Sequence, residues 1–123
     1  MRNRRTWLTL GVTAATIVLS ATAATAAGTW SSLGTGTSGD VLWLSAPAND
    51  VLYAGGSFTT AGGVSASKIA KWNGSAWSAL GTGTNLQVNT IATAPDGTLY
   101  AGGSYTSAGS APANYIAKWN GST

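Results

Sequence analysis

The heptapeptide IAKWNGS occupies residues 69–75 and returns unchanged at residues 116–122, 47 positions later. The repeat extends well beyond these seven residues. When residues 30–76 are laid over residues 77–123 without a gap, 25 of the 47 positions are identical. A fixed period of this length is typical of one supersecondary unit repeated along the chain, as in solenoids and propellers. The repeat is therefore the feature that decides the fold.

Each copy of the repeat predicts four short strands, because short apolar runs alternate with turn residues and no helical period is present. In the first copy the runs are residues 30–33, 41–45, 51–54 and 68–72. The third run ends in a Gly-Gly pair, which permits positive φ or the close approach of another backbone. The fourth run meets an Asn-Gly hairpin signal. We therefore expect Trp72 and Trp77 to face each other across an antiparallel hairpin.

Four-stranded antiparallel units that recur every 40–50 residues or so are the blades of a β-propeller. The pattern Tyr-x-Gly-Gly-x-Phe-Thr, then Ala-Gly-Gly, then Ile-Ala-x-Trp-Asn-Gly-x-x-Trp runs from Tyr53 to Trp77. It resembles kelch-type propellers, and more closely the secreted propeller repeats of bacterial surface proteins and fungal cortical polarity markers. We expect an all-β partial propeller of two four-stranded blades of 47 residues, residues 30–76 and 77–123, in permuted register.

Residues 1–27 have the features of a bacterial-type secretion signal peptide. They contain a basic start with three arginines, an apolar run and small residues before a cleavage site near Ala26-Ala27. The apolar run is short for a membrane span, so a retained anchor is the weaker alternative. Adjacent Arg4 and Arg5 leave the general-secretion and twin-arginine routes both open. We expect a protein that is secreted or held at the cell surface, with its repeats in residues 28–123.

The charged residues exclude several classes of function. The formal net charge of +3 comes from the three arginines of the first five residues, since the rest of the chain has three lysines and three aspartates. That balance gives no basic surface for nucleic acid. The chain has no His, Cys or Glu, and no two carboxylates are neighbours in sequence. We therefore expect no catalytic residue and no metal site, and we predict that the protein is not an enzyme.

Two short motifs are better explained by turns than by ligands. Residues 34–39 read G-T-G-T-S-G, but a dinucleotide fingerprint must open a helix, and no helical pattern follows. We expect no cofactor there. The Asn-Gly-Ser sequons beginning at Asn73 and Asn120 coincide with the predicted hairpin turn, which accounts for them without a glycan.

The aromatic residues are the candidates for ligand contact. The tryptophans that obey the repeat are expected in the blade cores. Trp43 is different, because its counterpart is Thr90. Phe58 and Tyr105 occupy equivalent positions in the loop after the Gly-Gly pair. Trp43, Phe58 and Tyr105 are therefore predicted to face a ligand, with the alternative that the two loop aromatics tuck under their own blades.

These observations favour a secreted, non-catalytic propeller module that binds a protein or polysaccharide, or serves as a scaffold. It could be one section of a larger propeller. The alternative is part of a secreted propeller enzyme, galactose oxidase-like or glycan-acting, whose active residues lie on other blades.

Two blades are too few to close a ring. If the chain is complete, we expect a homo-oligomer of three or four chains, in which residues 30–33 of one chain pair beside residues 118–120 of the next. A fragment of a longer repeat protein is the open alternative.

Overall fold

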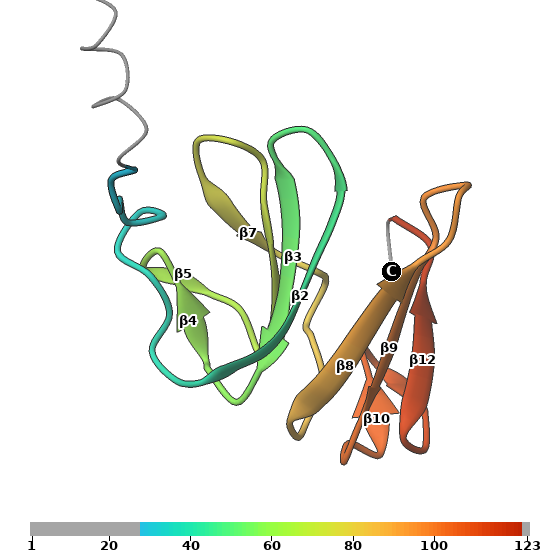
Figure 1. The fold of residues 1–123 in the computed structure, drawn as a ribbon. Coiled ribbons are helices and arrows are strands. Elements are labelled where there is room, and N and C mark those ends of the chain that lie inside the picture. The colour runs from blue at the N-terminus through green and yellow to red at the C-terminus, as the bar shows by residue number, and fades with distance from the viewer. Residues whose placement is uncertain (1–27, 122–123) are drawn as a thin grey trace, which may run out of the picture. The chain divides into compact units, whose positions relative to one another are not determined.

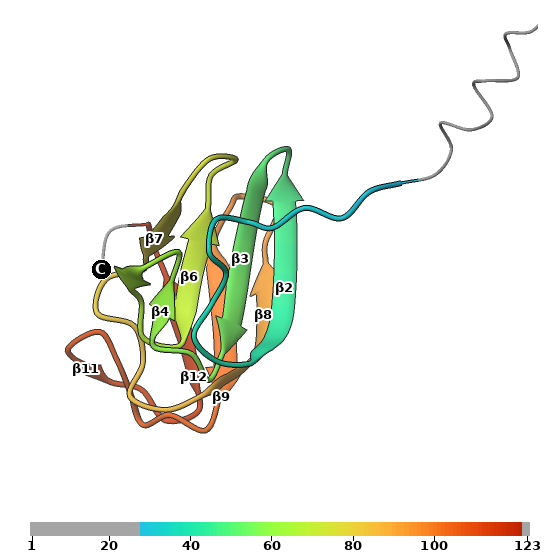
Figure 2. The same ribbon diagram turned by 90° about the vertical axis from the view of Figure 1, so that its left-hand side faces the viewer.

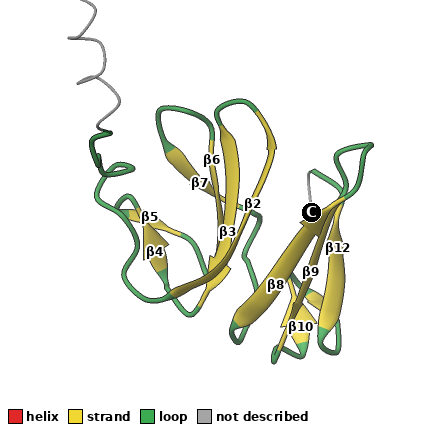
Figure 3. Ribbon diagram, in the orientation of Figure 1, coloured by secondary structure: helices red, strands yellow, loops and turns green. Residues whose placement is uncertain are grey.

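A computed structural model describes residues 28–121. The predicted signal peptide, residues 1–27, lies outside the described residues. All of the strands belong to one compact unit, Ser32–Thr123. Between residues 28 and 121 there is no helix, and hence none with the length and apolarity to cross a membrane. Figure 3 shows strands joined by loops throughout this part of the chain. The all-β prediction is confirmed for the described residues.

The first sheet contains four antiparallel strands (Figure 1). These are β2 (Val41–Ala48), β3 (Val51–Gly56), β6 (Ile69–Trp72) and β7 (Trp77–Ala79). Their order across the sheet is β2-β3-β6-β7, which is also their order in the chain. Figure 2 shows β2, β3 and β6 lying side by side. The three runs predicted around residues 41–45, 51–54 and 68–72 thus correspond to the first three strands of this sheet.

The second sheet contains three strands among the described residues: β8 (Val88–Thr93), β9 (Leu99–Gly103) and β12 (Ile116–Trp119). Their order is β8-β9-β12, so β8, β9 and β12 repeat β2, β3 and β6. The register repeats as well, because Ala54 pairs with Ala70 and Ala101 pairs with Ala117. One four-stranded sheet and one three-stranded sheet are therefore present among residues 28–121, and the predicted count of two four-stranded blades is not confirmed.

Residues 30–33 do not form the strand that their sequence predicts. Trp30 and Ser31 have no regular structure, and the Trp30 side chain is fully exposed. The same Trp-Ser-x-Leu sequence forms β7 when it returns at Trp77. The physical reason is that a strand needs an edge to pair with, and β7 has one in β6. Sequence identity alone does not supply that partner.

Two small hairpins were not predicted. They are β4 (Thr60–Ala61) with β5 (Val64–Ser65), and β10 (Ser107–Ala108) with β11 (Ala111–Pro112). Each hairpin is tied to the loop that opens its repeat. Thr37 bridges to Ala61 in the first copy, as Thr84 does to Ala108 in the second. The Gly-Thr-Gly-Thr loops at residues 34–37 and 81–84 therefore link the small hairpins to the start of each repeat.

The Gly-Gly pairs serve close backbone approach and not positive φ. A Cβ built on Gly56 would overlap the carbonyl oxygen of Asp40, and one built on Gly103 would overlap that of Gln87. Neither glycine has positive φ. A side chain at either position would push apart the first two strands of its sheet.

The Asn-Gly hairpin is confirmed, although its turn differs from the two-residue form. Trp72 pairs with Trp77, so the loop contains residues 73–76. Gly74 has φ of 102°, whereas Asn73 acts through its side chain. Its Oδ1 accepts hydrogen bonds from the backbone N–H groups of Ser75 and Ala76, both at 2.9 Å. The rings of Trp72 and Trp77 lie 5.5 Å apart with an interplanar angle of 58°, which confirms the predicted pair.

Two clusters form the core. The first belongs to the first sheet and the loops beside it, and consists of Ala54, Phe58, Ala61, Ala66, Ala70 and Trp77. The second cluster joins the two sheets, because Ile69 of β6 and Leu80, which follows β7, pack with residues of the second sheet and its loops. Those partners are Val88, Ile91, Leu99, Ala101 and Tyr105. The face of the first sheet that carries Ile69 is thereby covered by the second sheet.

Candidate functional site

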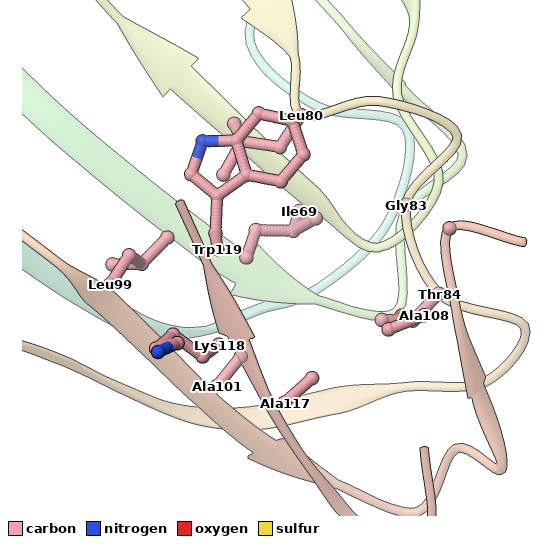
Figure 4. Close-up of a pocket in the computed structure, with 11 residues that line it drawn as sticks. Ile69, Leu80, Gly83, Thr84, Leu99, Ala101, Ala108, Ala117, Lys118 and Trp119 are labelled. Atoms are coloured by element: carbon pink, nitrogen blue, oxygen red, sulfur yellow. The ribbon is translucent and has the colours of Figure 1, made fainter. Parts of the chain in front are cut away.

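A pocket of ≈ 70 Å³ opens beside β12 in the second repeat (Figure 4). In Figure 4 the indole of Trp119 lies beside Leu80 and Ile69. The lining is apolar apart from Thr84 and Lys118, and the other lining residues are Gly83, Leu99, Ala101, Ala108, Gly109 and Ala117. Such a surface suits an apolar or aromatic group and carries no pair of acid and base side chains.

The corresponding place in the first sheet is filled by Trp77. Its indole Nε1–H donates a hydrogen bond of 2.9 Å to the carbonyl oxygen of Leu33. The Trp77 and Trp72 rings lie close to each other in a tilted arrangement. A Cβ built on Gly62 would lie 2.7 Å from the Trp77 Cδ1 atom, so only a glycine fits beneath the ring. Trp77 is almost completely buried as a result.

The pocket is the repeat equivalent of this Trp77 position. Moving 47 residues along the chain from Trp77's neighbours gives six of the pocket's lining residues. They are Leu80, Ala101, Ala108, Gly109, Ala117 and Trp119. A Cβ built on Gly109 meets no heavy atom within 4 Å, in contrast to Gly62. The second repeat thus has the surroundings of a buried tryptophan without that tryptophan among the residues that line them.

Trp43 is the one predicted ligand-facing residue that the structure places at the surface. It lies on β2 and is 48% exposed. Val41, Leu42 and Leu44 beside it are exposed too, so β2 presents apolar side chains on both of its faces at these four residues, which we call the β2 strip. Trp43 pairs across the sheet with Gly55, which has no side chain to cover the indole.

Phe58 and Tyr105 do not face a ligand, and this prediction is wrong for both. Their side chains are fully buried, one in each core cluster. The alternative that loop aromatics tuck under their own blades is the one observed. Burial of these rings removes a large apolar area from water, which accounts for the two aromatics at equivalent positions. The hydroxyl of Tyr105 donates to the carbonyl oxygen of Ala101, and burial raises the pKa of this hydroxyl.

The structure does not bring the carboxylates together. In the part of the chain described, no group of three or more His, Cys, Asp or Glu residues could hold a metal ion. Asp96 has a local role in its turn, because its Oδ1 accepts a hydrogen bond of 2.9 Å from the Thr98 N–H. That bond lowers the pKa of the Asp96 carboxyl below its ordinary value. The Asp96 side chain is a turn residue, as its place in Pro-Asp-Gly indicates.

Sequence reasoning missed the pocket residues Leu80, Gly109 and Ala117. The signal was available, since each is the 47-residue counterpart of a neighbour of Trp77. What the sequence does not show is that Gly62 and Gly109, identical in the repeat, meet different surroundings.

Comparison with known proteins gives one finding. A model of the family described as a beta-propeller domain of unknown function (DUF5122) matches residues 94–121, which include β9 to β12. No curated protein and no solved structure matches the chain. The matched stretch agrees with the repeated antiparallel sheets and with the period of 47 residues. The described part of the chain is therefore an all-β domain of β-propeller repeats.

Proposed function

We propose that this chain is a secreted, non-catalytic propeller module that binds a polysaccharide or a protein through the β2 strip, with Trp43 as the principal contact. The observation that carries the proposal is the exposure of Trp43. The repeat does not require an indole there, because Thr90 takes the equivalent position in β8. A half-exposed tryptophan on an edge strand offers the face of its indole to a sugar ring or an apolar side chain.

The composition supports a binding role over catalysis. From residue 28 onward the ionisable side chains are three lysines, three aspartates and four tyrosines. The pocket beside β12 has no acid and base pair, and the β2 strip has no ionisable group at all. Acid–base chemistry needs such groups within hydrogen-bond reach of a substrate. The export signal predicted for residues 1–27 supports a location outside the cell.

The experiment compares the wild type with Trp43→Thr, which introduces the residue that the repeat itself uses. The whole chain is expressed with its N-terminal segment, and mass spectrometry of the purified protein reads its N-terminus. Binding is measured on a glycan array and by capture of proteins from the secreting host's culture medium. We expect Trp43→Thr to weaken binding about tenfold or more, the loss expected when a buried aromatic contact of about 1.5–3 kcal/mol is removed.

Leu86→Ser is the matched control, because Leu86 is similarly exposed but lies in the loop before β8. Equal loss in both variants, or no loss in either, would show that the β2 strip is not the contact. An intact N-terminus at Met1 would contradict secretion through a cleaved signal. Turnover of a glycan on the array would contradict the non-catalytic role.

A further inference from the structure

We propose that two copies of this chain associate head to tail, so that residues 30–33 of one copy add a fourth strand to β12 of the other. Trp30 then fills the pocket beside Trp119. This goes beyond ligand binding by Trp43, and the proposed contact also covers Val41 and Leu44 of the β2 strip. The proposal rests on two independent comparisons between the repeats.

The first comparison concerns the incoming strand. Trp30, Ser31 and Leu33 are identical to Trp77, Ser78 and Leu80. In the first sheet this sequence forms β7 and pairs with β6. Its tryptophan, Trp77, is buried in a site lined by Trp72 and Gly62, which we call the tryptophan seat. The second sheet offers the same strand sequence in β12 and the same seat, lined by Trp119 and Gly109. Trp30 is fully exposed in the structure, and it is the same residue type as Trp77, which fills this seat in the first sheet.

The hydrogen-bond acceptor for the indole is also present. Trp77 donates to the Leu33 carbonyl, and the equivalent carbonyl in the second repeat belongs to Leu80. Both carbonyls accept a backbone bond of 3.1 Å from the glycine three residues later, Gly36 or Gly83. Since a carbonyl oxygen has two lone pairs, the Leu80 carbonyl retains the capacity that the Leu33 carbonyl uses for an indole.

The second comparison concerns the sheet faces. Ile69 of the first sheet is 5% exposed because the second sheet covers it, whereas its counterpart Ile116 is 67% exposed. At the other end, Val88 and Ile91 of β8 are 0% and 3% exposed, whereas their counterparts Val41 and Leu44 are 40% and 55% exposed. Within residues 28–121 the interface between the two sheets thus occurs once. The counterpart of each half, in the other repeat, is exposed.

The two exposed surfaces are complementary, because they are the repeat counterparts of the two sides that pack together within the chain. The face with Ile116 repeats the face that packs against β8, and the strand with Val41 and Leu44 repeats β8 itself. A second copy placed by the same relation as the second repeat would cover both the face and the β12 edge at once. Each such contact is heterologous, so repetition leads to a closed ring or to a filament.

A disulfide cross-link tests the register, since the chain has no cysteine of its own. Lys71 and Ser78 are directly paired in the first sheet, so Lys118 and the other copy's Ser31 are the expected pair. Cross-strand neighbours lie within the Cα distance that a disulfide accepts. We expect Ser31→Cys combined with Lys118→Cys to give covalent dimers and larger species on a non-reducing gel. Ser32→Cys combined with Lys118→Cys is the control, because adjacent side chains in a strand point to opposite faces.

Light scattering provides the second measurement, on the whole chain after purification. We expect the mass to exceed that of one chain at about 100 µM, and Trp30→Ala to raise the dissociation constant at least about tenfold. Because Trp30 is exposed, this variant leaves the fold of one copy intact. Leu86→Ser, in the exposed loop before β8, is the control and should leave the mass unchanged.

Three results would overturn the proposal. The first is a single-chain mass at all concentrations. The second is association that Trp30→Ala does not weaken. The third is a cross-link within one chain, or one that forms equally well at position 32. A single-chain mass would favour the alternative that further repeats of a longer protein fill the pocket.

Discussion

Gly62 and Gly109 form a natural pair for measuring what a buried tryptophan imposes on its surroundings. The two glycines hold the same repeat position and nearly the same backbone, with φ of 59° and 61°. Replacing either glycine with alanine lowers the free energy of unfolding by about 1 kcal/mol, because a residue with a Cβ is strained in the left-handed region. The backbone cost therefore cancels when the two variants are compared.

The difference between the variants comes from Trp77. The alanine Cβ at position 62 would lie 2.7 Å from Trp77 Cδ1 and 3.3 Å from Trp77 Cβ, whereas position 109 is open. The Trp77 indole cannot move freely, because it is hydrogen-bonded to Leu33 and packed on Trp72. Overpacking of this kind costs about 1–3 kcal/mol. We expect Gly62→Ala to lower the free energy of unfolding by about 2 kcal/mol more than Gly109→Ala does.

The assay is urea unfolding followed by tryptophan fluorescence, with the midpoints compared at equal slopes. It is carried out in dilute solution, so that association does not add to the apparent stability. For a domain of this size the difference corresponds to roughly 10 °C in Tm. Equal destabilisation of the two variants would refute the reasoning, since it would mean that the Trp77 indole can shift to accommodate the added methyl group.

Three further predictions concern single side chains. Tyr105→Phe should lower the free energy of unfolding by about 1 kcal/mol through loss of the bond to the Ala101 carbonyl, as measured by urea unfolding at neutral pH. Because burial raises the pKa of the Tyr105 hydroxyl, the unfolded chain loses this proton at a lower pH than the folded chain does. Stability should therefore fall as pH rises above about 10. Urea unfolding curves measured at increasing pH should show a shallower fall for Tyr105→Phe than for the wild type. Asn73→Ala removes three hydrogen bonds from the hairpin loop and should lower Tm by roughly 5 °C in a calorimeter, and an unchanged Tm would show that Gly74 alone makes the turn. Lys68 has φ of 71°, so Lys68→Val should destabilise by about 1–2 kcal/mol while Lys68→Asn should not, and equal urea midpoints would contradict the left-handed backbone.

Much of the fold could be predicted because the repeat shows the same strand and turn signals twice. The runs at residues 51–54 and 68–72 carry β-branched or aromatic residues between glycine-rich turns, and both form strands. The small hairpins could not be predicted in this way. β4 contains only Thr60 and Ala61, and a two-residue strand shows no period. Those hairpins depend on the loops that pair with them.

The site was predicted less well than the fold. Trp43 was identified because it breaks the repeat, and its side chain is about half exposed, which leaves its contact with a ligand a prediction. Phe58 and Tyr105 were predicted to face a ligand because they lie in the loop after the Gly-Gly pair, but a large apolar side chain next to a sheet gains more from burial than from exposure. The pocket beside Trp119 depends on which strands find partners. That property belongs to the three-dimensional arrangement and not to any single motif.

The identity of β6 and β12 has a consequence for how the chain folds. Both strands read IAKW, so β3 gains the same cross-strand neighbours from either of them during folding. Only the connecting loop distinguishes the two pairings: 12 residues separate β3 from β6, and 59 separate it from β12. The entropy of closing the longer loop disfavours the wrong pairing by about 1.4 kcal/mol, or about tenfold. Chain connectivity therefore selects the native pairing, and a minority of folding molecules should pass through a mispaired state that must open before the second sheet can form.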